Sequence, residues 1–305
     1  MMCSLAYVTL VMKSDKYVAG ALVLAQSLRN SGTKCTLICM ITNDISVKSI
    51  KVLKKFYDFV KTVPYITHKC ISLKNYRQRV LYEKWIESSF TKWNCLNPLI
   101  YDQMFDKVMF IDADMLVIEN CDEQLFSLKP PALTFSSPWA KPYSRQGVEN
   151  PYGELKHGID LSCEEVDHGF KSFVGCGSLV LLKPDQRVYN QMIKLLYQKN
   201  TFGFSQCFSG FDEQLICKTF CSLKESFRHI HQMYNWSAGK WQWLSIAKIN
   251  EPNLTPKVIH YYGDQKPWFS SRNNQWNDTN LWWDIADHII SKDDSTRKYF
   301  EFIAK

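Results

Sequence analysis

The 305-residue sequence lacks the features that mark several common protein classes. None of its eleven cysteines forms a C-x-x-C pair, which argues against a zinc knuckle or a dithiol redox motif. No apolar run reaches about 18 residues, so the sequence predicts no membrane insertion. The formal net charge is +7, yet no dense Lys/Arg cluster occurs, and nucleic acid is therefore not expected as a partner.

The cysteines and the N-terminus indicate a reducing compartment. Cys39 and Cys176 lie inside apolar, strand-like runs, where cysteine behaves as a small buried hydrophobic residue. The first residues show no basic segment followed by a long apolar core, so no secretory signal is expected. These patterns predict a cytoplasmic protein.

Short apolar segments alternate with helical patterns in the first part of the chain. The runs at residues 6–11, 35–41 and 108–111 are typical of buried strands. Residues 17–28, between the first two runs, have apolar side chains at helical spacing. This alternation predicts βαβ units, and hence an α/β fold with a largely parallel sheet.

The remainder of the chain gives a coarser prediction. Residues 78–90 have a helical pattern, whereas residues 139–167 contain prolines, glycines and mixed charges without a clear period. We expect the second stretch to be a long loop of the kind that borders binding sites. Because no linker is evident, we expect one main domain over residues 1–275 and a helical C-terminal appendage over residues 276–305.

An acidic motif follows the apolar run at residues 108–111. Asp112 and Asp114 are separated by Ala113 and come directly after this predicted strand. Open α/β sheets bind ligands beyond the carboxyl ends of their strands. Two carboxylates there form a hard oxygen site that suits Mg²⁺ or Mn²⁺ carrying a diphosphate. Taken alone, the motif fits equally well with polar strand-end residues that face water.

A second motif lies near the C-terminus. His260 ends an apolar run, Gly263 permits close backbone approach, and Lys266 precedes Pro267-Trp268. Histidine is a suitable third ligand for manganese, and lysine is a mobile point charge suited to a departing phosphate. Taken alone, the motif could also be a core histidine followed by a surface lysine.

These two motifs and the N-terminal strand together resemble glycosyltransferase family 8, and within it the glycogenin-like enzymes. Residues 110–114 match the family's F-[IM]-D-A-D segment, and residues 260–268 match its H-x-x-G-x-x-K-P-W segment. Residues 92–96 are also similar to a related group from large insect DNA viruses. The resemblance implies a GT-A type, Rossmann-like nucleotide-binding fold with a mixed, mostly parallel central sheet flanked by helices. It also implies a UDP-sugar donor, Mn²⁺ (with Mg²⁺ as the alternative) and retention of anomeric configuration.

The resemblance further implies roles for individual residues. Asp112, Asp114 and His260 are expected to hold the metal, and Lys266 to neutralise charge on the departing UDP. Lys92 is expected near the phosphates. The remaining contacts to the nucleotide sugar are expected from Thr9, Leu10, Tyr17, Ala113, Gly175, Cys176, Glu213 and Gly263.

Two positions near the expected sugar depart from the family pattern. Gly175 stands where the family usually has an asparagine, so an amide contact to the sugar is expected to be missing. Glu213 replaces an amide in the family's D-Q-x-L segment. Asp212 matches the carboxylate of that segment and is expected to be catalytic, although an aspartate before a helical run can also be an N-cap.

The acceptor is expected to be another molecule. Glycogenin-like enzymes glucosylate one of their own tyrosines. In the candidate region for such a tyrosine, Trp241, Gln242 and Trp243 carry no hydroxyl group. The two indole rings could stack on a carbohydrate or cap the core. We therefore expect transfer of a hexose, with glucose favoured, to an external carbohydrate or protein-linked acceptor. The expected enzyme is cytoplasmic, or in the host cytoplasm if viral, and a homodimer is left open.

Two other classes of function remain at this point. The departures at Gly175 and Glu213 allow a catalytically weak sugar-nucleotide or glycan-binding protein on the same fold. A nucleotidyltransferase would need a glycine-rich loop after the first strand, and residues 11–15 contain no glycine.

Overall fold

A computed structural model describes residues 4–70, 76–136, 155–169, 174–198, 211–239, 253, 255–263, 266–269 and 277–301. The chain divides into two compact units. Unit 1 comprises Met1–Leu5, Val63–Phe110 and Leu125–Gln232, and unit 2 comprises Ala6–Thr62, Ile111–Gln124 and Met233–Lys305. Each unit is described by itself.

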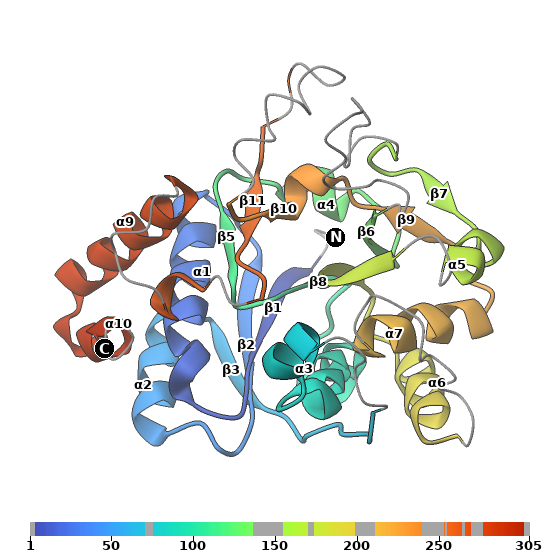
Figure 1. Ribbon diagram of the computed structural model, residues 1–305, viewed down its shortest axis with the longest axis horizontal. Coiled ribbons are helices and arrows are strands. Elements are labelled where there is room, and N and C mark those ends of the chain that lie inside the picture. Colours follow the sequence, from blue (N-terminus) through green and yellow to red (C-terminus); the bar gives the residue numbers. More distant parts are fainter. Residues whose placement is uncertain are drawn as a thin grey trace. The chain divides into compact units, whose positions relative to one another are not determined.

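The N-terminal part of unit 2 has the predicted βαβ organisation (Figure 1, blue). Strand β2 pairs in parallel with both β1 and β3. Most of α1, β1 and β2 is buried, which explains their nearly continuous apolar sequence. The elements are β1 (Leu5–Val11), the 3₁₀ helix η1 (Asp15–Tyr17), α1 (Val18–Asn30), β2 (Thr36–Ile41), α2 (Val47–Phe56) and β3 (Phe59–Thr62).

Unit 2 also contains a three-stranded sheet in the order β10-β11-β5. Its strands are β5 (Met115–Val117), β10 (Trp236–Ser237) and β11 (Val258–His260). Strand β11 runs antiparallel to β5, and His260 pairs with Met115. This register places the histidine beside the residue that follows the acidic motif.

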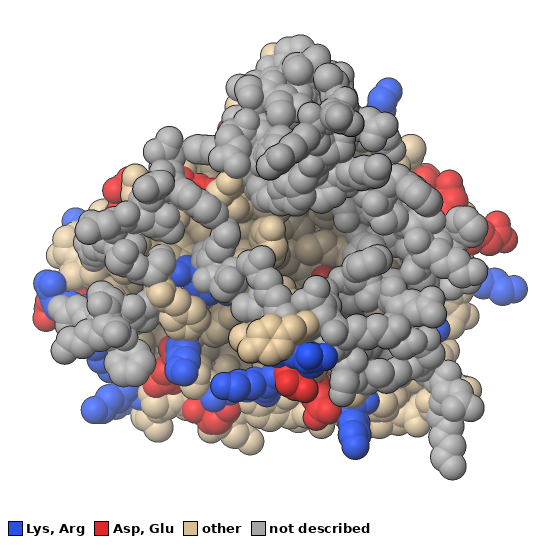
Figure 2. All heavy atoms as spheres, in the orientation of Figure 1, with Lys and Arg blue, Asp and Glu red and all other residues tan. Residues whose placement is uncertain are grey.

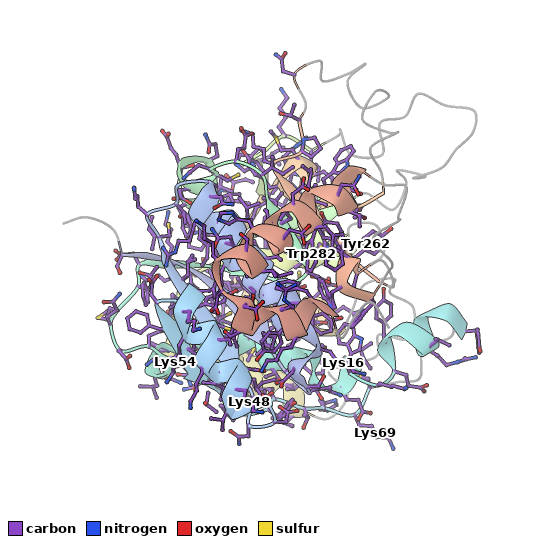
Figure 3. All side chains as sticks on the ribbon, turned by 90° about the vertical axis from the view of Figure 1, so that its left-hand side faces the viewer. Lys16, Lys48, Lys54, Lys69, Tyr262 and Trp282 are labelled. Carbon is purple, nitrogen blue, oxygen red and sulfur yellow. The ribbon has the colours of Figure 1, made fainter. Side chains whose placement is uncertain are left out.

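The C-terminal helices belong to unit 2 and pack against α1. They are α9 (Asn277–Lys292), η7 (Asp294–Thr296) and α10 (Arg297–Glu301), which agrees with the helical pattern predicted for this region. Trp282 of α9 is fully buried and lies 5.5 Å, centroid to centroid, from the ring of Trp268. The Tyr299 hydroxyl is hydrogen-bonded to that of Ser49 at 3.0 Å. Figure 3 shows α9 with Trp282 labelled, and Lys48 and Lys54 on the exposed side of α2.

Unit 1 contains the mixed part of the eight-stranded main sheet, in the order β4-β8-β6-β9-β7. Strand β6 is antiparallel to β8 and parallel to β9, and β9 is antiparallel to β7. The predicted α/β fold with a mixed sheet flanked by helices is therefore confirmed. The strands are β4 (Lys107–Ile111), β6 (Ala132–Ser136), β7 (Asp160–Leu161), β8 (Val174–Leu182) and β9 (Phe227–His229).

Helix α7 packs against β8, α5, α6 and the 3₁₀ helix η2 within unit 1. The helices of this unit are α3 (Tyr76–Tyr82), η2 (Ile86–Leu96), η3 (Pro98–Ile100), α5 (Cys163–Gly169), α6 (Gln186–Tyr197) and α7 (Phe211–Ser222). Two short elements, α4 (Asp122–Phe126) and η4 (Gln232–Tyr234), span points where the chain passes from one unit to the other.

Two local expectations are wrong. The single helix predicted over residues 78–90 is replaced by α3 and η2. Every residue of η2 except Glu87 is buried, so this segment has no solvent-facing side to produce an amphipathic helix. In residues 155–167, the described part of the long loop predicted over residues 139–167, the structure has β7 and the start of α5, and residues 139–154 lie outside the described residues.

Opposite charges are interspersed on the described surface. Within unit 2, Arg29 makes two hydrogen bonds to Asp58 at 2.7 and 2.8 Å, and Lys257 pairs with Glu119 at 2.8 Å. Figure 2 shows Lys and Arg side chains next to Asp and Glu side chains on the face that it displays.

No described helix combines the length and the hydropathy that crossing a bilayer requires.

A buried histidine in unit 1 makes the stability of the fold depend on pH. His229 on β9 is 2% exposed, and its Nδ1 accepts a hydrogen bond from the Phe135 backbone N–H at 3.2 Å. Burial, followed by the nearby His231 and His157, lowers the pKa of His229 to about 3. The folded protein therefore keeps this ring neutral at a pH at which the unfolded chain protonates it.

We expect the His229 contribution to weaken the fold as the pH falls from about 6.5 towards about 3, by about 1.4 kcal/mol per pH unit. Denaturant unfolding at several pH values measures this slope. The variant His229→Asn, whose amide oxygen can still accept a hydrogen bond, should be less sensitive to acid than the wild type. His288→Gln removes an exposed histidine and should leave the slope unchanged. Equal slopes for wild type and His229→Asn would contradict the prediction.

Candidate functional site

The acidic motif forms the turn between β4 and β5. The Met115 backbone N–H donates to the Asp112 carbonyl at 3.1 Å, which closes the turn. Potential ligand atoms of Asp112, Asp114 and His260 all lie within 4.8 Å of one another. The three residues that were expected to share a metal are thus brought together, although they come from two segments almost 150 residues apart.

The donor set of this cluster suits a divalent cation such as Mn²⁺ or Mg²⁺. Asp112 and Asp114 offer carboxylate oxygens, and His260 offers an imidazole nitrogen. The His260 Nδ1 is 3.0 Å from the Asn235 Oδ1. Because an amide oxygen only accepts, Nδ1 is the donor of this hydrogen bond, and in the neutral ring Nε2 is then the nitrogen that can bind a metal. This Nε2 lies 3.6 Å from the Asp114 Oδ1.

Lys266 binds directly to this cluster. Its Nζ donates to the Asp114 Oδ2 and, at 2.6 Å, to the Tyr261 carbonyl. Lys266 is 4% exposed and Asp114 is 8% exposed, so this is a buried ion pair. The alternative of a surface lysine after the histidine is therefore wrong.

Aromatic rings lie next to Lys266. Its Nζ is 6.0 Å from the centre of the Tyr17 ring, and that ring contacts Trp268 and Phe269 edge-on, with centroids 5.5 and 6.3 Å apart. Trp268 and Phe269 belong to the 3₁₀ helix η6 (Pro267–Phe269). Tyr17, which is expected to contact the nucleotide, is thus close to Lys266.

The other expected nucleotide contacts in unit 2 differ in accessibility. Thr9 and Ala113 are buried, whereas Leu10 is half-buried. Gly263 adopts a positive φ of 69°, a conformation that favours glycine. The Ala113 carbonyl oxygen lies close to α1.

That contact involves Gly20, which was not among the expected site residues. A Cβ atom at this position would lie 2.4 Å from the Ala113 carbonyl oxygen and 2.7 Å from the Trp268 Cη2. Gly20 therefore lets α1 approach the acidic turn and the Lys-Pro-Trp segment at the same point. The only sequence signal is a glycine inside a helical pattern, which often marks close packing.

We expect Gly20→Ala to destabilise the protein by about 1–3 kcal/mol, because the added methyl group overlaps a backbone oxygen that cannot move independently. Alanine normally stabilises a helix relative to glycine, so this prediction has the opposite sign to helix propensity. Denaturant unfolding of the variant and the wild type measures the difference. An increase in stability would show that the close contact is absent.

A second group of expected residues lies in unit 1. Lys92 of η2 and Asp212 of α7 form an ion pair, with Nζ and Oδ2 3.0 Å apart. They are 9% and 4% exposed, respectively. The Lys92 Nζ also donates to the Gly177 carbonyl at 3.4 Å, and the Trp93 Nε1 donates to the Asp212 carbonyl at 3.0 Å. This pairing of two expected site residues was not anticipated from the sequence.

Asp212 is not an N-cap. Helix α7 begins at Phe211, so Asp212 lies inside its first turn, where a carboxylate interacts favourably with the helix dipole. The neighbouring Glu213 accepts a hydrogen bond from the Gly177 backbone N–H at 2.8 Å through its Oε1. A Cβ atom at Gly177 would lie 2.8 Å from the Glu213 Cγ, so this glycine permits the contact.

Gly175 and Cys176, two expected site residues that precede Gly177, have different surroundings. A Cβ atom at Gly175 would lie 2.8 Å from the Leu133 Cδ1 and 3.3 Å from the Cys217 Sγ, so a larger side chain there would enter packed core. Cys176 is half-buried, and its Sγ is 3.1 Å from the Ser178 Oγ. The segment with Trp241, Gln242 and Trp243 lies outside the described residues.

Comparison with known proteins gives relatives of one kind. No family model matches the chain. It is 27% identical to an uncharacterised protein of Acanthamoeba polyphaga mimivirus, over 88% of this chain and 83% of that protein. It is 26% identical to glycogenin-1 of Caenorhabditis elegans over 87% of this chain, and 27% identical to glycogenin of Neurospora crassa over 90%. The matches span 51% and 34% of these two glycogenins.

Solved structures give the same fold. The galactosyltransferase LgtC, in complex with donor and acceptor sugar analogs, matches 92% of this chain and 95% of its own, with a TM-score of 0.59 and 12% identity. The bifunctional glycosyltransferase WbbM matches 96% of this chain and 52% of its own, with a TM-score of 0.57 and 13% identity. At this identity the likeness establishes the fold alone.

The fold is therefore that of the GT-A glycosyltransferases, and the relatives support a sugar transferase. Within that class the chain is similar to glycogenins and to a viral protein. The resemblance that the two motifs indicated is confirmed.

Proposed function

We propose that the protein is a Mn²⁺-dependent, retaining glycosyltransferase that moves a hexose, with glucose favoured, from a UDP-sugar to an external acceptor. The observation that carries the proposal is the convergence of Asp112, Asp114 and His260, with Lys266 buried against Asp114. Similarity to the glycogenins supports a nucleotide sugar as the donor.

In this proposal the cluster holds the diphosphate end of the donor. Asp112, Asp114 and His260 would hold the metal, which would supply positive charge to neutralise the diphosphate. Asn235 fixes the tautomer and the orientation of His260. Lys266 brings a further positive charge to the phosphate that leaves.

The reaction breaks the bond between the anomeric carbon and the UDP oxygen and forms a bond from that carbon to the acceptor oxygen. The acceptor hydroxyl must lose its proton, either to the leaving phosphate or to a carboxylate. We assign Asp212 to the sugar, where its carboxylate stabilises the positive charge that develops on the ring. Lys92 holds this carboxylate in place through their ion pair.

Several further assignments belong to this proposal. The catalytic machinery is assigned to residues 1–275, with a helical C-terminal segment over residues 276–305. A cytoplasmic location is supported by buried free thiols at Cys35, Cys39 and Cys95. A homodimer is left open, and size-exclusion chromatography with light scattering decides between monomer and dimer.

Donor hydrolysis and binding test the proposal directly. The protein is incubated with UDP-glucose, UDP-galactose, UDP-GlcNAc or UDP-xylose, with and without Mn²⁺, and UDP release and intact protein mass are measured. We expect UDP release that requires Mn²⁺, fastest with UDP-glucose, from a protein of unchanged mass. Binding without turnover would favour the sugar-nucleotide-binding alternative, and a ladder of added hexoses would show that the acceptor is the protein itself.

A further inference from the structure

Lys266 binds the same carboxylate that is assigned to the metal. Its ammonium donates to the Asp114 Oδ2, and the other oxygen of that carboxylate faces His260. Both partners of the ion pair are buried, so each charge depends on the other for compensation. A second cation that approaches Asp114 is therefore repelled by the Lys266 ammonium or must displace it.

A divalent ion held by this cluster and the Lys266 ammonium would share the Asp114 carboxylate. All three potential ligand atoms lie within 4.8 Å of one another, and the ion would bind carboxylate oxygen at about 2.0–2.2 Å. An ammonium that kept its contact with the same carboxylate would then face two positive charges at a few ångströms. Lysine has a flexible four-carbon stem, so its charge can move by rotation of the side chain.

The chain offers the ammonium a partial alternative near Asp114. The Tyr261 carbonyl already accepts from Lys266, and the Tyr17 ring lies 6.0 Å from the Nζ. Neither group carries a negative charge. With only these described neighbours, a displaced ammonium lacks a full counter-charge until an anion arrives.

We propose that Lys266 is a built-in counter-cation of Asp114 that the metal displaces, so that metal binding transfers the lysine charge from Asp114 to the donor diphosphate. This inference rests on the proposed function and adds to it how the binding of the metal and the binding of the nucleotide depend on each other. Without nucleotide, Lys266 and the metal compete for Asp114. With nucleotide, the diphosphate accepts the displaced ammonium, so metal and UDP bind cooperatively. By linkage, each raises the affinity of the other by the same factor.

The chemical accessibility of Lys266 in the wild-type protein gives the first test. The protein is acetylated briefly with an N-hydroxysuccinimide ester alone, with Mn²⁺, and with Mn²⁺ plus UDP, and lysine modification is quantified by peptide mass spectrometry. We expect Mn²⁺ alone to raise labelling of Lys266 several-fold, and added UDP to lower it again. Lys257, which pairs with Glu119 in the same unit, is the internal reference and should not respond.

Mn²⁺ affinity gives the second test. In Lys266→Met, calorimetry without nucleotide should show Mn²⁺ bound about tenfold or more tightly than in wild type, because a neighbouring positive charge is gone. The factor by which UDP raises Mn²⁺ affinity should shrink in the same variant. Lys257→Met removes one lysine charge from the same unit and should match the wild type in both measurements.

The outcomes separate the inference from the proposed function. A wild-type protein that binds no Mn²⁺ with or without UDP overturns the proposed function and this inference with it. Mn²⁺ binding that leaves the labelling of Lys266 unchanged overturns the inference alone. Equal or weaker Mn²⁺ binding by a folded Lys266→Met also overturns it, and if that variant does not fold, the labelling of the wild type decides.

Discussion

Asp114→Asn is expected to abolish the gain in UDP affinity that Mn²⁺ provides and to lower the transfer rate by about a thousandfold or more. Asparagine keeps the shape of the side chain but removes the negative charge that a metal requires. The same change leaves the buried Lys266 without its counter-charge, so we also expect a loss of stability of about 3 kcal/mol.

Calorimetric titration of UDP with and without Mn²⁺ measures the first effect, and UDP release from the donor measures the second. Glu119→Gln is the matched control, since it removes a carboxylate from the same unit that pairs with the partly exposed Lys257. This control should keep both the Mn²⁺ effect and the rate. A Mn²⁺-dependent gain in UDP affinity that survives in Asp114→Asn would disprove the metal assignment.

The parts of this site that follow from local sequence could be predicted. Apolar runs of strand length and helical spacing indicated the N-terminal βαβ unit, because burial of whole strands leaves a continuous apolar pattern. The acidic motif directly follows such a run, so its place at a strand end could be recognised. The His260 motif could be recognised in the same way, and the structure brings both motifs together.

Local sequence alone does not predict the contacts between distant segments, and the meeting of His260 with the acidic motif was expected only from the family resemblance. The approach of His260 to Asp114 depends on the antiparallel register of β11 with β5, and no local pattern specifies a register. The close contact of Gly20 with Ala113 depends on how α1 packs. Each of these contacts joins residues that are far apart in sequence, where a single chain offers no pairing signal.

At Gly175 the sequence could not show what a side chain would meet. The missing asparagine was expected to remove a contact with the sugar. In the structure, a side chain at this position would point towards Leu133 and Cys217. The direction of a strand residue depends on which face of the sheet it occupies, and that alternation could be counted only once the bounds of β8 were known.

The ion pair between Lys92 and Asp212 allows a structural role to be separated from a catalytic one. Both side chains are buried, so removal of either partner leaves an uncompensated charge in unit 1. We expect Lys92→Met and Asp212→Leu each to lower the free energy of unfolding by about 3–5 kcal/mol. In the double variant both charges are absent, so we expect most of this loss to be recovered.

Activity should not follow stability in this series. If Asp212 acts on the sugar, Asp212→Leu and the double variant should both lose at least about a hundredfold in kcat, although the double variant is stable. Urea unfolding and UDP release, measured on the same preparations, give the two quantities. Asp160→Asn breaks the ion pair with Arg228 in the same unit, where Asp160 is 65% exposed, and should change stability by less than about 1 kcal/mol. A stable double variant with near wild-type turnover would show that Asp212 serves only to neutralise Lys92.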